Sequence, residues 1–192
     1  MLSERAKELI KKSRIVTFEN WEKTYSPEVL AIFQRANNES RYLTDEEIQQ
    51  IREVAPHLED SLQQAQTLRN NVMEIVNNAR GEILATFPQI IEPGGGLYPP
   101  MRAEACWRDF WHFLRCISYG VAAQSKNYTS QKGLGYMEEL YRELEVPLDA
   151  MVLGLKNLKA FSLEYFTPAE ATNLAVYFDR LIEQMEEFSI SK

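Results

Sequence analysis

Apolar residues recur at every third or fourth position along most of the chain, which is the spacing of one face of an α-helix. The longest run predicts a single helix from Leu58 to near Phe87-Pro88, roughly seven turns long. A loop rich in glycine and proline follows over residues 89–100. Further helices are predicted for residues 101–123, from Leu134 to the Val146-Pro147 junction, and through Met151 and Leu158. Strand-like alternation is nearly absent, so the pattern predicts an all-α fold.

Capping residues mark where several helices begin. Three segments carry such signals: Ser26-Pro27, Thr44-Asp45-Glu46-Glu47 and Thr167-Pro168-Ala169-Glu170. Pro56 is expected to interrupt the helix that the second segment opens. The third opens a last helix whose apolar stripe extends to Phe188. We expect residues 1–25 to form a helical extension with a connection, and residues 26–192 to form one domain.

Composition and charge exclude several classes of protein. The chain has 192 residues, 45% of them hydrophobic, and a net charge of -7, so it offers no broad basic surface for nucleic acid. No apolar run approaches the ~20 residues of a transmembrane helix. The first residues lack the apolar core of a signal peptide. We therefore expect a cytoplasmic protein with no transmembrane segment.

The two cysteines, Cys106 and Cys116, lie in the same predicted helix. Ten residues of helix separate them by about 15 Å, which is too far for a disulfide. With only two histidines and no metal-ligand spacing, the sequence predicts no metal site. It also contains no catalytic triad, no paired catalytic carboxylates and no phosphate loop, so we do not expect an enzyme.

Residues 101–119 combine aromatic rings with reactive groups. On an ideal helix one face would carry a cation, a thiol, a carboxylate and two aromatic rings: Arg102, Cys106, Asp109, Phe110 and Phe113. This set suits a linear tetrapyrrole (bilin). A thiol can add to a side chain of ring A, a carboxylate can accept hydrogen bonds from pyrrole N–H groups, and arginine can pair with propionates.

Several segments resemble the phycobiliprotein family. Cys106-Trp107-Arg108-Asp109, followed by Leu114-Arg115 and Ser118-Tyr119, resembles the family's Cys-x-Arg-Asp, Leu-Arg and Thr-Tyr motifs. Three further segments are similar in the same order: Ala36 to Leu43, Ala79 to Pro88, and Gly135 to Pro147. Together the matches cover roughly residues 28 to 165.

The resemblance implies a globin-like fold and a site for a bilin. It implies a phycocyanobilin-like pigment joined to Cys106 by a thioether, with Asp109 binding the pyrrole nitrogens. Arg108 and Arg102 would contact propionates, and Tyr119 would line the pocket. The role of Arg108 rests on the resemblance alone, because an ideal helix turns it about 200° away from Cys106.

The resemblance also implies function and partners. We expect a light-harvesting phycobilisome protein that absorbs or transfers light energy and forms homo- or hetero-oligomers with similar subunits. A phycobilisome linker or a bilin lyase would be further partners, and the phycobilisome would hold the protein peripherally at the thylakoid membrane.

The main alternative is a non-light-harvesting relative that serves as an assembly, regulatory or tetrapyrrole-carrier scaffold without covalent pigment. Two features favour it: the extra N-terminus, and Ala122-Ala123-Gln124 where the family has Ala-Gly-Asp. Simpler roles also stay open for single residues. Cys106 and Cys116 could be core residues, Asp109 could form an ion pair with Arg102 or Arg115, and His112 could be a hydrogen-bonded or partly exposed histidine.

Overall fold

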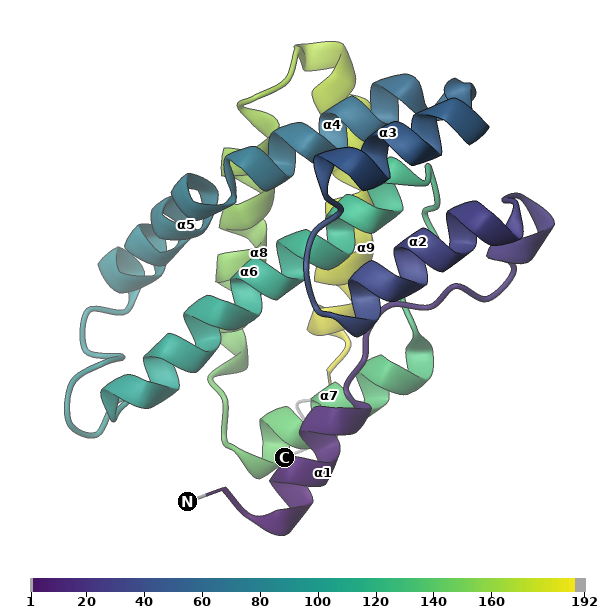
Figure 1. Ribbon diagram of the computed structural model, residues 1–192. Helices are drawn as coiled ribbons and strands as arrows, with labels where there is room; N and C mark the ends of the chain where they lie inside the picture. The colour runs from purple at the N-terminus through teal and green to yellow at the C-terminus, as the bar shows by residue number, and fades with distance from the viewer. Residues whose placement is uncertain (1, 189–192) are drawn as a thin grey trace.

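The computed structural model describes residues 2–188 and is built from helices (Figure 1). Their bounds are α1 (Glu4–Lys12), α2 (Pro27–Asn38), α3 (Asp45–Val54), α4 (Glu59–Asn70), α5 (Val72–Thr86), α6 (Pro100–Ala122), α7 (Gln131–Glu143), α8 (Leu148–Leu163) and α9 (Pro168–Glu186). Short 3-10 helices cover Trp21–Lys23 and Pro56–Leu58. Within the described residues the only β pairing is an isolated bridge between Val16 and Thr129. The expected all-α fold is confirmed.

The helices pack around α6, which crosses the middle of the molecule (Figure 1). α4 and α5 lie along α6, α8 packs against α5, and α9 packs against α8 and α6. Gly154 of α8 lets Phe110 of α6 approach closely, because a Cβ at this glycine would lie 2.1 Å from the Phe110 ring. The fully buried rings of Phe110 and Phe178 belong to the single large core that these helices share.

The local signals place most helix starts correctly. Thr44 with Glu47, and Thr167 with Glu170, form complete capping boxes at α3 and α9. Pro56 follows the end of α3, as expected. Of the described helices, none is both long and apolar enough to cross a membrane.

The single helix predicted from Leu58 to Phe87 is wrong, because the structure breaks it into α4 and α5 at Asn71. The side-chain amide of Asn71 donates to the carbonyl of Thr67 at 2.8 Å, an acceptor that the Asn71 backbone N–H also uses. A short amide side chain that competes for helical carbonyls favours an interruption of this kind. The apolar spacing continues through the break, which is why periodicity did not reveal it.

Residues 2–25 pack against the helices that follow them. α1 packs on α7 through a small cluster of Ala6, Leu9 and Leu140, separate from the large core. Trp21 instead belongs to the large core, where it contacts Phe33 of α2. Residues 189–192, the end of the expected 26–192 domain, lie outside the described residues.

Candidate functional site

The two halves of α6 have different surroundings. From Phe113 to Ala123 every residue is buried, and Gly120 permits the ring of Tyr128 to pack against the helix. In the first half, Glu104 and Arg108 are exposed, and Asp109 is partly buried. The first half of α6 therefore has a face that α2–α5, α8 and α9 do not cover.

A cavity of about 500 Å³ lies beside this face. Both halves of α6 contribute to its lining, through Ala105, Arg108, Asp109, His112, Phe113, Arg115 and Cys116. α7 forms a second wall, and residues of the N-terminal segment between Leu2 and Ile15 form a third. Ligand sites of small molecules typically enclose about 300–1,000 Å³ and combine apolar walls with a few polar groups, so this cavity has the size and lining of a ligand site.

Asp109 supplies a carboxyl group to the cavity wall, and its pKa departs from the usual value. Burial raises its pKa from 3.8 to about 6, although the positive charge of Arg108 opposes this rise. Burial disfavours the charged form of a carboxyl group unless hydrogen bonds compensate it. Asp109 is therefore positioned to accept hydrogen bonds from a ligand that offers N–H donors.

Cys106 lies one helical turn before Asp109, but it is buried and is not among the residues that line the cavity. Burial, together with the nearby charge of Asp109, raises the pKa of its thiol to about 12, while Arg102 opposes the rise. The Tyr141 side chain of α7 interacts electrostatically with both groups. Its buried hydroxyl has no hydrogen-bond partner within the described part of the chain. An unpaired buried hydroxyl beside a cavity is a group that a ligand can satisfy.

His112 adds an uncharged ring to the cavity wall. Burial and the nearby charges of Arg115 and Arg108 lower its pKa to about 4. Its Nδ1 accepts a hydrogen bond from Arg115 at 3.3 Å. Near neutral pH the ring is therefore neutral and hydrogen-bonded, and no group of three or more His, Cys, Asp or Glu suited to a metal occurs in the described residues.

Arg102 binds the backbone in this structure. Its guanidinium donates to the carbonyls of Gly96, Leu144 and Glu145 at 2.7–3.1 Å. These bonds tie the start of α6 to the preceding loop and to the end of α7. Arg102 therefore holds two walls of the cavity together, and it is not among the lining residues.

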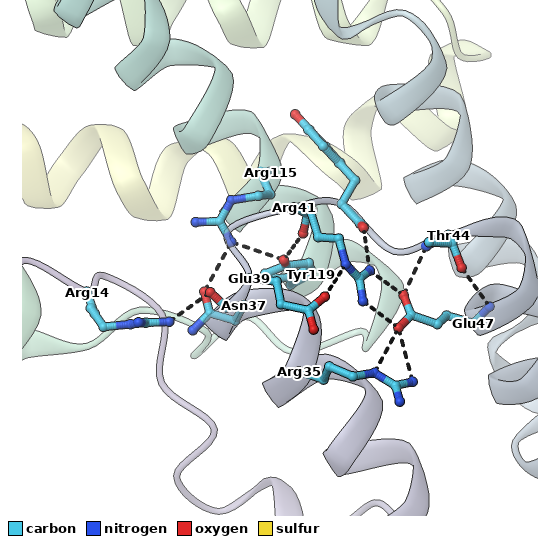
Figure 2. A network of polar contacts seen from close by, with 10 residues as sticks. Arg14, Arg35, Asn37, Glu39, Arg41, Thr44, Glu47, Arg115 and Tyr119 are labelled. Carbon is cyan, nitrogen blue, oxygen red and sulfur yellow. Dashed lines mark hydrogen bonds and ion pairs between the residues drawn. The ribbon is translucent and has the colours of Figure 1, made fainter.

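Tyr119 lies in a polar network at the other end of α6 (Figure 2). Arg115 donates to Asn37 Oδ1 at 3.1 Å and to the Tyr119 hydroxyl at 3.0 Å, and that hydroxyl donates to the Arg41 carbonyl. Arg41 forms an ion pair with Glu47 at 2.7 Å. Tyr119 is not among the lining residues, but its partner Arg115 and the Asn37 side chain both line the cavity, so the network reaches the cavity wall.

Comparison with known proteins covers most of this chain. The family described as "Phycobilisome protein" matches residues 31–185. The allophycocyanin alpha-B chain of a Synechococcus species is 35% identical over 158 residues, which are 82% of this chain and 97% of that protein. The allophycocyanin alpha-B subunit of a Synechocystis species is 31% identical over 82% of this chain and 98% of its own length. The allophycocyanin alpha chain 2 of Microchaete diplosiphon is 30% identical over 79% of this chain and 94% of its own length.

The chain belongs to the phycobilisome protein family. The matched region of this phycobilisome protein contains α6 and α7, which form two walls of the cavity. The third wall comes from residues before position 31, outside the matched region.

Several cavity residues of this phycobilisome protein were not singled out in the sequence. They are Tyr141 and Met137 of α7 together with Ile10, Lys11 and Arg14 of the N-terminal segment. Tyr141 falls in a segment that carries the family resemblance, so its position was a usable signal. The N-terminal residues had no such signal, because their place at the cavity depends on how α1 docks.

Proposed function

We propose that this phycobilisome protein binds a linear tetrapyrrole (bilin) in the cavity beside α6 and serves as a light-absorbing subunit of the phycobilisome. The observation that carries the proposal is Asp109, a partly buried carboxyl with a raised pKa that faces a cavity of about 500 Å³. Carboxyl groups kept in such an environment commonly mark functional sites.

The residues of the cavity fit the chemical groups of a bilin. The Asp109 carboxylate would accept hydrogen bonds from pyrrole N–H groups, which would replace the solvation it loses on burial. The exposed guanidinium of Arg108 would pair with a propionate. Met137 and Leu140 of α7 supply apolar surface against which a planar ring system can lie. When bound, the pigment supplies the visible absorption.

Covalent attachment would take place at Cys106. The thiol would add across the ethylidene double bond of ring A: a sulfur–carbon bond forms, the thiol proton goes to the neighbouring carbon, and no oxidant or reductant is consumed. The thiolate is the nucleophile, and a pKa of about 12 leaves roughly one thiol in 10⁵ ionised at pH 7. We therefore propose that a bilin lyase opens this side of α6 during attachment.

Arg102 and Tyr119 keep the roles implied by the resemblance only as predictions. Arg102 would have to exchange at least one backbone carbonyl for a propionate. Tyr119 would contribute to the pocket wall through its hydrogen bond with Arg115, which lines the cavity. The proposed assembly is a homo- or hetero-oligomer with similar subunits, with a linker as a further partner, at the surface of the thylakoid membrane.

The test is to co-express the protein with bilin-synthesising enzymes and a lyase, and to examine it on a denaturing gel by zinc-enhanced fluorescence. We expect a fluorescent band for the wild type and for Cys116→Ala, and no band for Cys106→Ala. Cys116→Ala is the control, because Cys116 is the other buried free cysteine of α6 and, unlike Cys106, lines the cavity.

Three results would contradict parts of the proposal. No band in the wild type, in a system that labels a known phycobiliprotein, would favour the non-pigmented scaffold. A band that survives in Cys106→Ala would move the attachment site. A pigmented Asp109→Asn variant with the wild-type absorption band would remove Asp109 from the pigment contacts.

A further inference from the structure

α1 lies beside α7 (Figure 1), and both apolar and polar contacts hold it there. Leu9 is buried with Leu140, and Ser3 Oγ donates to Glu143 at 2.8 Å. The Lys12 ammonium lies 5.4 Å from the centre of the Tyr136 ring. These contacts come from three successive turns of α7, so they determine which face of α1 turns toward the cavity.

The segment after α1 is also held in place. The Ile15 carbonyl accepts from the Ser130 N–H at 2.8 Å, and Arg14 donates to the Asn37 carbonyl at 2.7 Å (Figure 2). The chain passes so close to Gly133 that a Cβ there would lie 1.8 Å from the Arg14 carbonyl oxygen. Residues 3–15 are therefore fixed at both ends, on α7 and beside α2.

This fixed segment presents apolar and cationic side chains to the cavity. Ile10 and Lys11 line it from α1, and Ile15 lines it from the segment that follows. Ile10 is 47% exposed although it lies between two anchored segments of the chain. An isoleucine left half in solvent at a cavity wall is a surface that a planar apolar ligand would bury. Lys11 adds a cation on a different wall from Arg108.

We propose that Ile10 and Lys11 contact the pigment and that residues 3–15 form one wall of the bilin site. Ile10 covers a pyrrole ring, and Lys11 pairs with a propionate carboxylate. The inference rests on the proposed function, but it concerns residues outside the matched family region of residues 31–185. The ligand class is an open-chain tetrapyrrole with free carboxylates.

The test measures non-covalent binding of two probes to the full-length apoprotein without a lyase. Biliverdin is an open-chain tetrapyrrole with two propionates, and biliverdin dimethyl ester lacks their charges. Lys11→Gln is expected to weaken biliverdin binding by about fivefold, as suits a partly exposed ion pair, and to leave the ester unchanged. Ile10→Ser is expected to weaken both probes, because it removes apolar surface. Lys7→Gln is the matched control on α1, since Lys7 pairs with Glu4 of the same helix and does not line the cavity.

A second measurement does not depend on pigment spectra. Hydrogen exchange of the α1 amides is expected to slow when biliverdin binds, and to quicken in the apoprotein of Leu9→Ala, which loses the anchor on Leu140. If wild type binds neither probe, this inference fails, and the zinc-fluorescence gel decides the proposed function separately. If wild type binds biliverdin, and Lys11→Gln and Ile10→Ser bind each probe as tightly as wild type does, the inference alone is overturned.

Discussion

The two halves of α6 bury ionisable side chains in different ways. In the second half, Arg115 bonds to Asn37 and Tyr119, and Tyr119 bonds onward to the Arg41 carbonyl. In the first half, burial raises the pKa of Asp109 to about 6. The Tyr141 hydroxyl beside it finds no hydrogen-bond partner within residues 2–188. The second half of α6 thus carries a hydrogen-bonded network, whereas Asp109 in the first half lies beside an unpaired hydroxyl of α7.

This difference distinguishes polar groups that stabilise the fold from polar groups that a ligand can satisfy. A buried polar group costs free energy unless it is hydrogen-bonded, so a fully paired network stabilises the fold by itself. Unpaired groups beside a cavity lower the stability of the apoprotein and are satisfied only when a ligand supplies the missing partners. The polarity of α6 alone would not distinguish the two halves, whereas the pairing does.

The largest expected effect comes from breaking the polar network to which Arg115 and Tyr119 of α6 belong. Glu47→Ala removes the capping-box carboxylate of α3 together with its ion pairs to Arg41 and Arg35. We expect the free energy of unfolding to fall by about 2–4 kcal/mol, measured by urea denaturation. Glu46→Ala is the control, since Glu46 is exposed in the same helical turn. Equal urea midpoints for the two variants would contradict the scaffold role of the network.

A substitution of Asp109, in the first half of α6, is expected to raise the free energy of unfolding rather than lower it. Since the folded pKa of Asp109 is raised to about 6 from 3.8, ionisation costs stability above pH 6 and costs nothing below pH 4. Asp109→Asn should therefore stabilise the apoprotein by about 1–2 kcal/mol at pH 7.5, a value reduced for partial exposure, and by almost nothing at pH 4. Urea titrations of both proteins at the two pH values measure this. Lower stability of the variant at pH 7.5 would mean that Asp109 is paired in the fold.

Two tyrosines give the finest comparison. Tyr119→Phe removes a hydroxyl that bonds to Arg115 and to the Arg41 carbonyl, so we expect a loss of about 1–2 kcal/mol in unfolding free energy. Tyr141→Phe removes an unpaired hydroxyl and is expected to change the apoprotein by less than about 0.5 kcal/mol, or to stabilise it. Thermal unfolding of the two variants side by side measures the difference. Equal losses would show that both hydroxyls have partners in the apoprotein.

The sequence predicted well what depends on near neighbours. The capping boxes at Thr44 and Thr167 and the break at Pro56 are confirmed, because each rests on residues within a few positions. The prediction failed at Asn71, where one side chain interrupts a run whose apolar spacing continues. For the site, helical spacing correctly placed Cys106 and Asp109 on neighbouring turns of α6. It could not predict that Asp109 lines the cavity and that Cys106 does not.

By itself, then, the sequence determined the all-α fold, the family and the order of the groups along α6, because helical periodicity, caps and motif spacing are properties of short segments. Only the tertiary structure decided which of these groups face a cavity and which are paired. Tyr119 is paired through Arg41, 78 positions earlier in the chain. The cavity exists because α1 docks on α7, with Ser3 bonded to Glu143 across 140 positions. Contacts over such separations arise from packing of whole helices, which no local pattern records.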